Sequence, residues 1–565
     1  MDDYSGSSVD GGRTTGLLLI TDVGSTTTKA LLLKRSDRGL EFTGMADSPT
    51  TVERPHEDVK VGIVDALRKL EEITGLNLSR GGMPSVPYLT TSSAGGGLQM
   101  LVFGLTSVET GKIAEHTACG AGGVVLRTIT IDDGLKAVEK MMYIQKLHPD
   151  MILLAGGTDG GAIAGVVRLA ELLILADPEP KFRQNDKIPL VFCGNTEARS
   201  FVTEALRDGF DLHIVDNVRP SLDRLNIEPA RQAVHRLFMD NVMERAPGYS
   251  ELKDFTISDI LPTPAAVESI LGSYSRSKGE TAVMIDIGGA TTDIFSGAGG
   301  DATRTVAANT GVSYSMSNVL AEAGLDEVMR HLPDGLSPGA VRDYICNKTL
   351  NPTLLPTSES ERLIEHAIAI AGGRSAWRDH LMTRARMNKL GMLQRMKEDT
   401  TDRFTSTFFW KRENYGVDLS SISLIIGAGG VMSHAGRMGS LRILTEIFLP
   451  EGITLLAIDK HFRSPHLGIL STIDEPEALR LFEEECLQPV GYVVAPSEVT
   501  SEKPALELRN LNSGVKSEVK GGDVLLLESG GRLEFRFTGD REDVEIHHLT
   551  TDLPVLIDCR GRDQE

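Results

Sequence analysis

The chain has 565 residues, of which 41% are hydrophobic and 24% are charged, a composition ordinary for a soluble globular protein. This length predicts several domains, each with its own hydrophobic core. The formal net charge of −21 argues against nucleic acid or an anionic membrane surface as a partner, because both attract basic patches.

The cysteines and the hydropathy pattern indicate a reducing, aqueous compartment. The five cysteines are dispersed, and no pair has the close spacing of a zinc site or a redox dithiol. No uninterrupted apolar run approaches the length that spans a membrane, and the start of the sequence lacks the pattern of a secretory signal. We therefore expect a cytoplasmic protein.

The first candidate site follows a polar segment, residues 1–15, which we expect to be a disordered tail. Residues 17–33 read LLLITDVGSTTTKALLL, and these two apolar runs around a Gly- and Thr-rich turn predict a hairpin of two strands. Such a turn presents N–H groups and hydroxyls to a phosphate, and Asp22 at its mouth is a candidate metal ligand. The candidate phosphate ligands are Gly24, Ser25, Thr26, Thr27 and Lys29, although Lys29 could instead point along the outer strand.

Next come segments typical of α/β folds. Apolar residues at helical spacing predict a helix over 59–73, and residues 88–97 read as a strand that ends in a Ser/Gly loop. Three further strands, 151–154, 189–192 and 211–215, are separated by helical stretches. This alternation predicts a parallel, doubly wound sheet in a middle region.

A second copy of the hairpin lies at residues 281–296, which read TAVMIDIGGATTDIFS. Aligning Asp22 with Asp286 places Gly24 on Gly288 and Lys29 on Asp293. The repeat predicts an internal duplication in which two similar lobes face one nucleotide. The candidate ligands from this second hairpin are Gly288, Gly289, Thr291 and Thr292 for phosphate, and Asp286 and Asp293 for the metal ion.

A third motif follows, because residues 423–431, SLIIGAGGV, read as a strand that enters a Gly-rich turn before a helix. Gly427, Gly429 and Gly430 would allow the close backbone approach that an adenine and a ribose require. Two lone histidines downstream, His434 and His466, have no partner at metal spacing, so we expect structural roles for them.

The remaining segments complete the organisation. Between the second hairpin and the Gly-rich turn we expect helices over 360–371 and 381–397, and beyond it a strand over 453–458. After a linker-like stretch at 496, short strands separated by Gly turns predict a small β module.

The order of these three motifs resembles the ATPase superfamily that contains actin, Hsp70 chaperones and sugar kinases. The strings TTSSAGGGLQM, MILLAGGTDGG and LPTPAAV, with GAGGVMSHA, are similar to the MutL-type glutamate mutase accessory proteins, which are distinct from the DNA mismatch-repair protein of the same name. The resemblance covers about residues 17–495. It implies an α/β fold with duplicated actin-like (ribonuclease H-like) ATPase lobes, an inserted α/β region and a small C-terminal β module.

The expected division is therefore as follows: tail 1–15, first lobe 16–105, middle α/β region 106–278, second lobe 279–495 and β module 496–565. In the nucleotide cleft, Asp22, Asp286 and Asp293 would orient Mg²⁺ through its waters, and Asp286 would also position the attacking water. The resemblance implies an ATP-driven protein that releases and replaces the damaged cofactor of an adenosylcobalamin-dependent mutase.

Other activities share part of this pattern. A small-molecule kinase would present an aspartate base to a hydroxyl, and a hydantoinase or oxoprolinase-type hydrolase uses a similar nucleotide fold. A dehydratase activator with an iron–sulfur cluster needs closely placed cysteines, which this chain lacks. An actin-like filament subunit is a non-enzymatic alternative.

Overall fold

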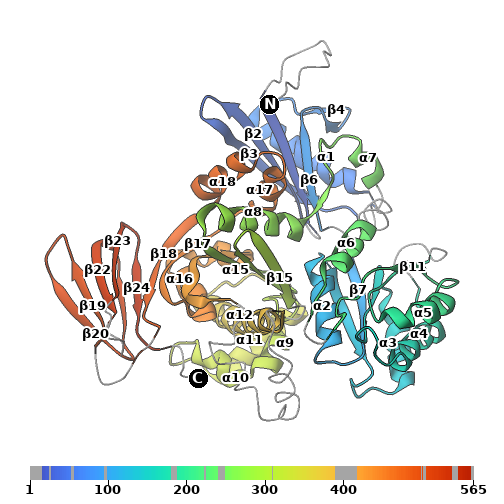
Figure 1. Ribbon diagram of the computed structural model, residues 1–565. Helices are drawn as coiled ribbons and strands as arrows, with labels where there is room; N and C mark the ends of the chain where they lie inside the picture. Colours follow the sequence, from blue (N-terminus) through green and yellow to red (C-terminus); the bar gives the residue numbers. More distant parts are fainter. Residues whose placement is uncertain are drawn as a thin grey trace.

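The structure is a computed structural model that describes residues 16–24, 27–52, 56, 58–93, 98–121, 123–179, 187–221, 224–238, 248–307, 310–387, 417–497, 499, 504–537 and 545–561. The expected tail, Ser25, Thr26 and the last ten residues of the expected helix 381–397 lie outside the described residues. The chain is a mixed α/β protein in which helices separate and cover the sheets (Figure 1).

The first sheet has the strand order β12-β6-β1-β2-β3. Its strands are β1 (Leu17–Val23), β2 (Thr27–Ser36), β3 (Gly39–Pro49), β6 (Tyr88–Ser92) and β12 (Leu261–Pro262). The three strands β1, β2 and β3 are antiparallel, whereas β6 pairs with β1 in parallel. Helix α1 (Val59–Thr74) covers one face, and its apolar stripe is buried as the periodicity predicts.

Read from its other edge, the first sheet has the order β3-β2-β1-β6-β12. The second sheet repeats this order as β15-β14-β13-β16-β17. Its strands are β13 (Thr281–Ile287), β14 (Thr292–Ala298), β15 (Asp301–Ala307), β16 (Ile422–Ala428) and β17 (Gly452–Ile458). The directions also repeat, since β13, β14 and β15 are antiparallel and β16 pairs with β13 in parallel. The two sheets therefore share strand order and strand direction.

Three later strands extend the second sheet beyond β17, namely β18 (Gln488–Ala495), β24 (Val555–Asp558) and β21 (Val524–Leu527). The other late strands form a separate four-stranded sheet of β19 (Pro504–Asn510), β20 (Lys516–Lys520), β22 (Gly531–Phe537) and β23 (Glu545–Thr551). The segment after residue 496 is therefore a β structure, but two of its strands belong to the sheet of the second lobe.

The middle region is a five-stranded sheet in the order β11-β10-β9-β7-β8, and all its pairs are parallel, as predicted. Its strands are β7 (Leu98–Gly104), β8 (Gly123–Thr130), β9 (Met151–Leu154), β10 (Pro189–Phe192) and β11 (Asp211–Ile214). One core contains side chains of α2 (Thr110–Gly120) and α6 (Glu228–Leu237). The other contains side chains of α3 (Ala137–Leu147), α4 (Ala164–Ala176) and α5 (Arg199–Leu206). Strand β7 belongs to this sheet, although the expected division at residue 105 had placed residues 98–104 in the first lobe.

Two helices lie between the first and second sheets (Figure 1). Helix α8 (Thr263–Lys278) follows the first sheet but packs on β13, β14 and β15 of the second. Helix α17 (Ser464–Ser471) follows the second sheet but packs on β1 and β6 of the first. The helices contact each other closely at Gly468, where a Cβ atom would lie 1.8 Å from the carbonyl oxygen of Ala266. The lobes are thus joined through a shared apolar core.

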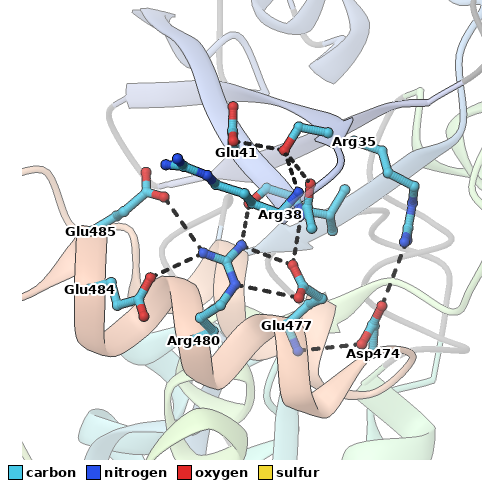
Figure 2. A network of polar contacts seen from close by, with 11 residues as sticks. Arg35, Arg38, Glu41, Asp474, Glu477, Arg480, Glu484 and Glu485 are labelled. Carbon is cyan, nitrogen blue, oxygen red and sulfur yellow. Dashed lines mark hydrogen bonds and ion pairs between the residues drawn. The ribbon is translucent and has the colours of Figure 1, made fainter.

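Figure 2 shows how α18 (Glu475–Leu481) is fixed to the turn between β2 and β3. The carboxylate of Glu477 accepts a hydrogen bond of 2.7 Å from the Leu40 N–H, while the Arg480 guanidinium donates to the Leu40 carbonyl. Arg480 also lies 2.9 Å from Glu477, which lowers the pKa of that carboxyl group. Because both backbone groups of Leu40 are bound, α17 and α18 are held on the first lobe.

One prediction for the second lobe is corrected. The helix expected over 360–371 and the described part of the second, residues 381–387, are one helix, α12 (Glu359–Met387), which continues through Gly372 and Gly373. A Cβ atom at Gly373 would lie 2.5 Å from Ile447 Cδ1, so close packing accounts for a glycine inside the helix. No helix among the described residues is long and apolar enough to cross a membrane.

Candidate functional site

A cavity of about 540 Å³ opens between the first and second sheets, a size within the usual range of small-molecule sites. The first lobe contributes Thr27, Lys29, Met45 and Asp47. The second lobe contributes Asp286, Gly429, Gly430, Ser433, His434, Lys460, His461, Phe462 and Arg463. Five of the predicted ligands, Thr27, Lys29, Asp286, Gly429 and Gly430, therefore line one cavity.

The two hairpin turns have matching geometry. The Gly24 N–H donates to the Thr27 carbonyl at 3.0 Å, and the Gly288 N–H donates to the Thr291 carbonyl at 2.9 Å. In register, Asp22 pairs with Lys29 and Asp286 pairs with Asp293. The residues that the sequence alignment equates therefore occupy equivalent register positions in the two hairpins.

Asp22 is buried, is not among the residues found to line the cavity, and accepts hydrogen bonds from two neighbouring segments. Its Oδ1 accepts hydrogen bonds from the Thr91 hydroxyl at 2.8 Å and the Thr263 hydroxyl at 2.6 Å. Helix α8 begins at Thr263 itself after Pro262, and the Thr263 hydroxyl is directed to Asp22. Asp22 thus ties β1 to β6 and to the first residue of α8.

Asp286 is the acidic residue of the second hairpin that faces the cavity. Burial, together with the negative charges of Asp293 and Asp459, raises its pKa to about 7, while Lys29 acts in the opposite sense. A carboxyl group with a pKa near the ambient pH can accept a proton from a nucleophile and later return it. This property fits a general base or a group that orients water.

Other residues of the second hairpin form hydrogen bonds and an ion pair with neighbouring strands and loops. Asp293 forms an ion pair with Arg304 of β15, with Arg304 Nε 2.7 Å from its Oδ1. The Thr292 hydroxyl donates to the Thr310 carbonyl at 2.9 Å. The Gly289 carbonyl accepts the N–H groups of the loop at 313–314. Gly288, Gly289, Thr291, Thr292 and Asp293 are not among the residues found to line the cavity.

Lys29 reaches from the first lobe to the second. Its Nζ donates to the His461 carbonyl at 3.2 Å and lies 5.2 Å from the centre of the Phe462 ring. Phe462 has a φ of +53°, a conformation that is strained for a bulky side chain. Arg463 stacks on Phe42 of β3, with 4.3 Å from the guanidinium carbon to the ring centre. The segment Asp459–Arg463 therefore bridges the lobes at the cavity.

This bridging segment was missed by the sequence reasoning. The available signal was its position at the carboxyl end of strand β17, where α/β sheets place ligand contacts. His434 also lines the cavity, although we expected a structural role, and its Nδ1 lies 2.8 Å from the Gly430 carbonyl. His466 is fully buried in α17, and burial lowers its pKa to about 4, so it is neutral at pH 7.

The donor set fits a magnesium ion held mainly by phosphate and water. Among the described residues, no three His, Cys, Asp or Glu side chains form a group suited to chelate a metal ion. Asp22 Oδ1 already accepts two hydroxyls and Asp293 Oδ1 is paired with Arg304, whereas Asp286 and Asp47 face the cavity. Mg²⁺ usually keeps several waters and needs only one or two carboxylates, which this arrangement supplies.

The Gly-rich turn after β16 packs against the second hairpin. Gly429 has a φ of +96°, and a Cβ atom there would lie 2.2 Å from the Ile287 carbonyl oxygen. We expect Gly429→Ala to weaken nucleotide binding by about tenfold or more, because β13 and the turn must separate to admit the methyl group. Equilibrium titration with a fluorescent ATP analogue measures the change.

Gly436→Ala is the matched control for this substitution. Gly436 also has a positive φ, +69°, but no atom lies within 4 Å of the position of a Cβ atom. The control should therefore cost only the backbone strain, and its affinity for nucleotide should stay near that of the wild type. Equal affinities for the two variants would contradict a role of Gly429 in shaping the site.

Comparisons with known proteins show the family of this chain. The family model described as "MutL protein" matches residues 18–486. Protein MutL of Clostridium tetanomorphum is 28% identical over 496 residues, which cover 82% of this chain and 98% of that protein.

Solved structures that match the chain include a diol dehydratase-reactivating factor in nucleotide-free form, with a TM-score of 0.30 and 12% identity over 81% of this chain and 99% of that one. Component A of the Acidaminococcus fermentans (R)-2-hydroxyglutaryl-CoA dehydratase has a TM-score of 0.27 and 10% identity over 82% of this chain and 100% of that one. The family model spans most of the chain and all three motifs, and the chain therefore belongs to the MutL protein family.

Proposed function

We propose that this protein binds Mg·ATP between its two lobes and hydrolyses it. The observation that carries the proposal is one cavity lined by Lys29 from the first hairpin, Asp286 from the second and the Gly-rich turn at Gly429. Lys29 and Thr27 of the first hairpin would bind the phosphates, and the turn would accept the adenosine. Asp286 would orient and deprotonate the attacking water.

We propose further that the first and second sheets are the lobes of a duplicated actin-like ATPase. Their shared strand order and direction support this assignment. Bound Mg·ATP would contact Lys29 through its phosphates and Asp286 through the water around the metal ion, and hydrolysis would release that closure. In this proposal the middle α/β region and the C-terminal β module carry contacts to a partner.

We infer that the partner is an adenosylcobalamin-dependent mutase of the glutamate mutase type. Membership of the MutL family supports this, because the MutL-type proteins that the sequence resembles accompany such mutases. ATP turnover would then drive the release of damaged cofactor and its replacement. A small-molecule kinase or an ATP-dependent hydantoinase-type hydrolase is the alternative activity for the same cavity.

An ATPase assay of the full chain, with and without a mutase inactivated on its cobalamin, tests this proposal. We expect slow hydrolysis by the protein alone, faster hydrolysis with the inactivated mutase, and recovery of mutase activity when fresh adenosylcobalamin is present. Rapid turnover that requires a sugar or a cyclic amide, with no effect of the mutase, would select the alternative.

A further inference from the structure

Arg304 joins the second hairpin to the middle α/β region. It lies in β15 and is only 5% exposed. Its Nε and Nη2 are 2.7 Å and 2.5 Å from Asp293 Oδ1, and its Nη1 lies 3.4 Å from the Cys119 carbonyl oxygen in the last turn of α2. The guanidinium therefore binds the Asp293 carboxylate of the second hairpin with one edge and the end of α2, in the middle α/β region, with the other.

The α2 end is a suitable partner for this cation. Its last carbonyl groups carry the negative end of the helix dipole, which favours a nearby arginine. Helix α2 packs along β15, the edge strand of the second sheet, and Cys119 is buried in that contact. Within the described part of the chain, Arg304 is thus a direct polar link from the second hairpin to α2.

The middle region also contacts the first sheet, so it touches the first sheet as well as β15 of the second. Residues between its sheet and β12 include α7 (Tyr249–Lys253), where the Tyr249 hydroxyl bonds to the Ser92 hydroxyl and Glu251 pairs with Lys60 of α1. The apolar core of the first lobe continues into α2 and α6. A movement of one lobe relative to the other must therefore change the contact between α2 and β15.

We propose that Arg304 is a positioning residue that couples the occupancy of the cleft to the docking of the middle region through α2. In the described state, its short bonds go to Asp293 and its bond to Cys119 is long. When Mg·ATP draws the first and second sheets together, the middle region moves with the first sheet toward β15, and Arg304 comes closer to the Cys119 carbonyl. The end of α2 then becomes more protected. This inference rests on the proposed binding of Mg·ATP.

Hydrogen–deuterium exchange of the full chain tests the coupling. Peptides that cover α2, residues 110–121, are followed with and without a non-hydrolysable Mg·ATP analogue, and binding of the analogue is measured separately by calorimetry. We expect slower exchange of α2 in the wild type with the analogue bound. Bound analogue with unchanged or faster exchange of α2 overturns the coupling, whereas failure of the analogue to bind overturns the proposed function itself.

Arg304→Lys is the main variant, because loss of all positive charge beside the half-buried Asp293 could unfold the protein. Lysine keeps the charge but has no planar fork to hold Asp293 and the Cys119 carbonyl together. We expect Arg304→Lys to bind the analogue and to lose the slowing of α2 exchange. The same slowing in this variant as in the wild type contradicts the role of Arg304.

Arg330→Gln provides the matched control, since Arg330 is an exposed arginine of α10 (Leu325–Arg330) that pairs with Glu327 at 2.9 Å. It touches neither α2 nor the cavity, so the control should keep the response of the wild type. Loss of the response in this control as well would show that the effect is not specific to Arg304.

Discussion

Asp286→Asn is expected to reduce ATP hydrolysis about a hundredfold or more and, at the same time, to stabilise the nucleotide-free protein. The loss of activity follows because an amide cannot accept the proton of the attacking water. The gain in stability follows because burial and the charges of Asp293 and Asp459 disfavour the ionised carboxylate in the folded state. The catalytic role proposed for Asp286 thus carries a cost in folding free energy.

The stability difference between Asp286→Asn and the wild type is expected to increase with pH. The folded-state pKa of Asp286 is about 7, whereas an aspartate in an unfolded chain titrates near pH 3.9. Between these values the folded protein binds more protons than the unfolded one, so the contribution of Asp286 to stability is lost as the pH rises. The advantage of Asp286→Asn should therefore grow by as much as about 3 kcal/mol between pH 5 and pH 8.

Urea unfolding of both proteins at the two pH values measures this difference. Asp65→Asn is the control, because Asp65 is an exposed residue of α1 that lies 3.1 Å from Arg68, and its replacement removes the same charge. We expect that control to change the free energy of unfolding by no more than about 0.5 kcal/mol. Wild-type rates of hydrolysis in Asp286→Asn, or a stability difference that does not grow with pH, would contradict the role of Asp286.

Gly468→Ala is expected to destabilise the protein by about 3 kcal/mol or more and to weaken the joint between the lobes. A Cβ atom at this position would lie 1.8 Å from the backbone oxygen of Ala266, and a backbone atom cannot move aside as a flexible side chain can. Helices α8 and α17 must separate, and the core shared by the two sheets separates with them. Chemical denaturation measures the loss, and nucleotide titration measures its effect on the cleft.

Gly339→Ala is the matched substitution in another helix, α11 (Pro338–Leu350), where the nearest atom to a Cβ would be 4.0 Å away. Alanine favours a helix over glycine by up to about 1 kcal/mol, so this control should be neutral or slightly stabilising. Equal effects of the two substitutions would mean that the α8–α17 contact does not limit the packing of the lobes.

Much of the fold could be predicted because its strands are strongly apolar and end at glycine turns. The first hairpin, the second hairpin and the strand before Gly429 are where the sequence predicts them, and the middle sheet is parallel. Strand β3 was missed because most of its residues are at least partly exposed and it contains Gly44, so it lacks a hydrophobic pattern. Strand β7 is clearly apolar, but no local pattern tells which of two sheets it joins.

Parts of the candidate site could not be predicted because they depend on distant contacts. Lys29 lies beside His461 and Phe462, which are more than 400 residues away in the sequence. The pairing of Asp293 with Arg304 depends on β15, whose polar sequence was not recognised as a strand. The helix expected over 360–371 ends just before Gly372 and Gly373, but tertiary packing accounts for both glycines within the longer helix α12.

Binding of Mg·ATP to the full chain and to Lys29→Met tests the central claim most directly. Lys187→Met serves as the control. Lys187 is an exposed lysine of the middle region, and its Nζ donates a hydrogen bond to the Arg207 carbonyl. Equilibrium titration should give one ATP for each wild-type chain, similar affinity for the control, and about tenfold weaker binding for Lys29→Met. Absence of ATP binding by the wild type, or equal affinity in Lys29→Met, would contradict a nucleotide site shared by the two lobes.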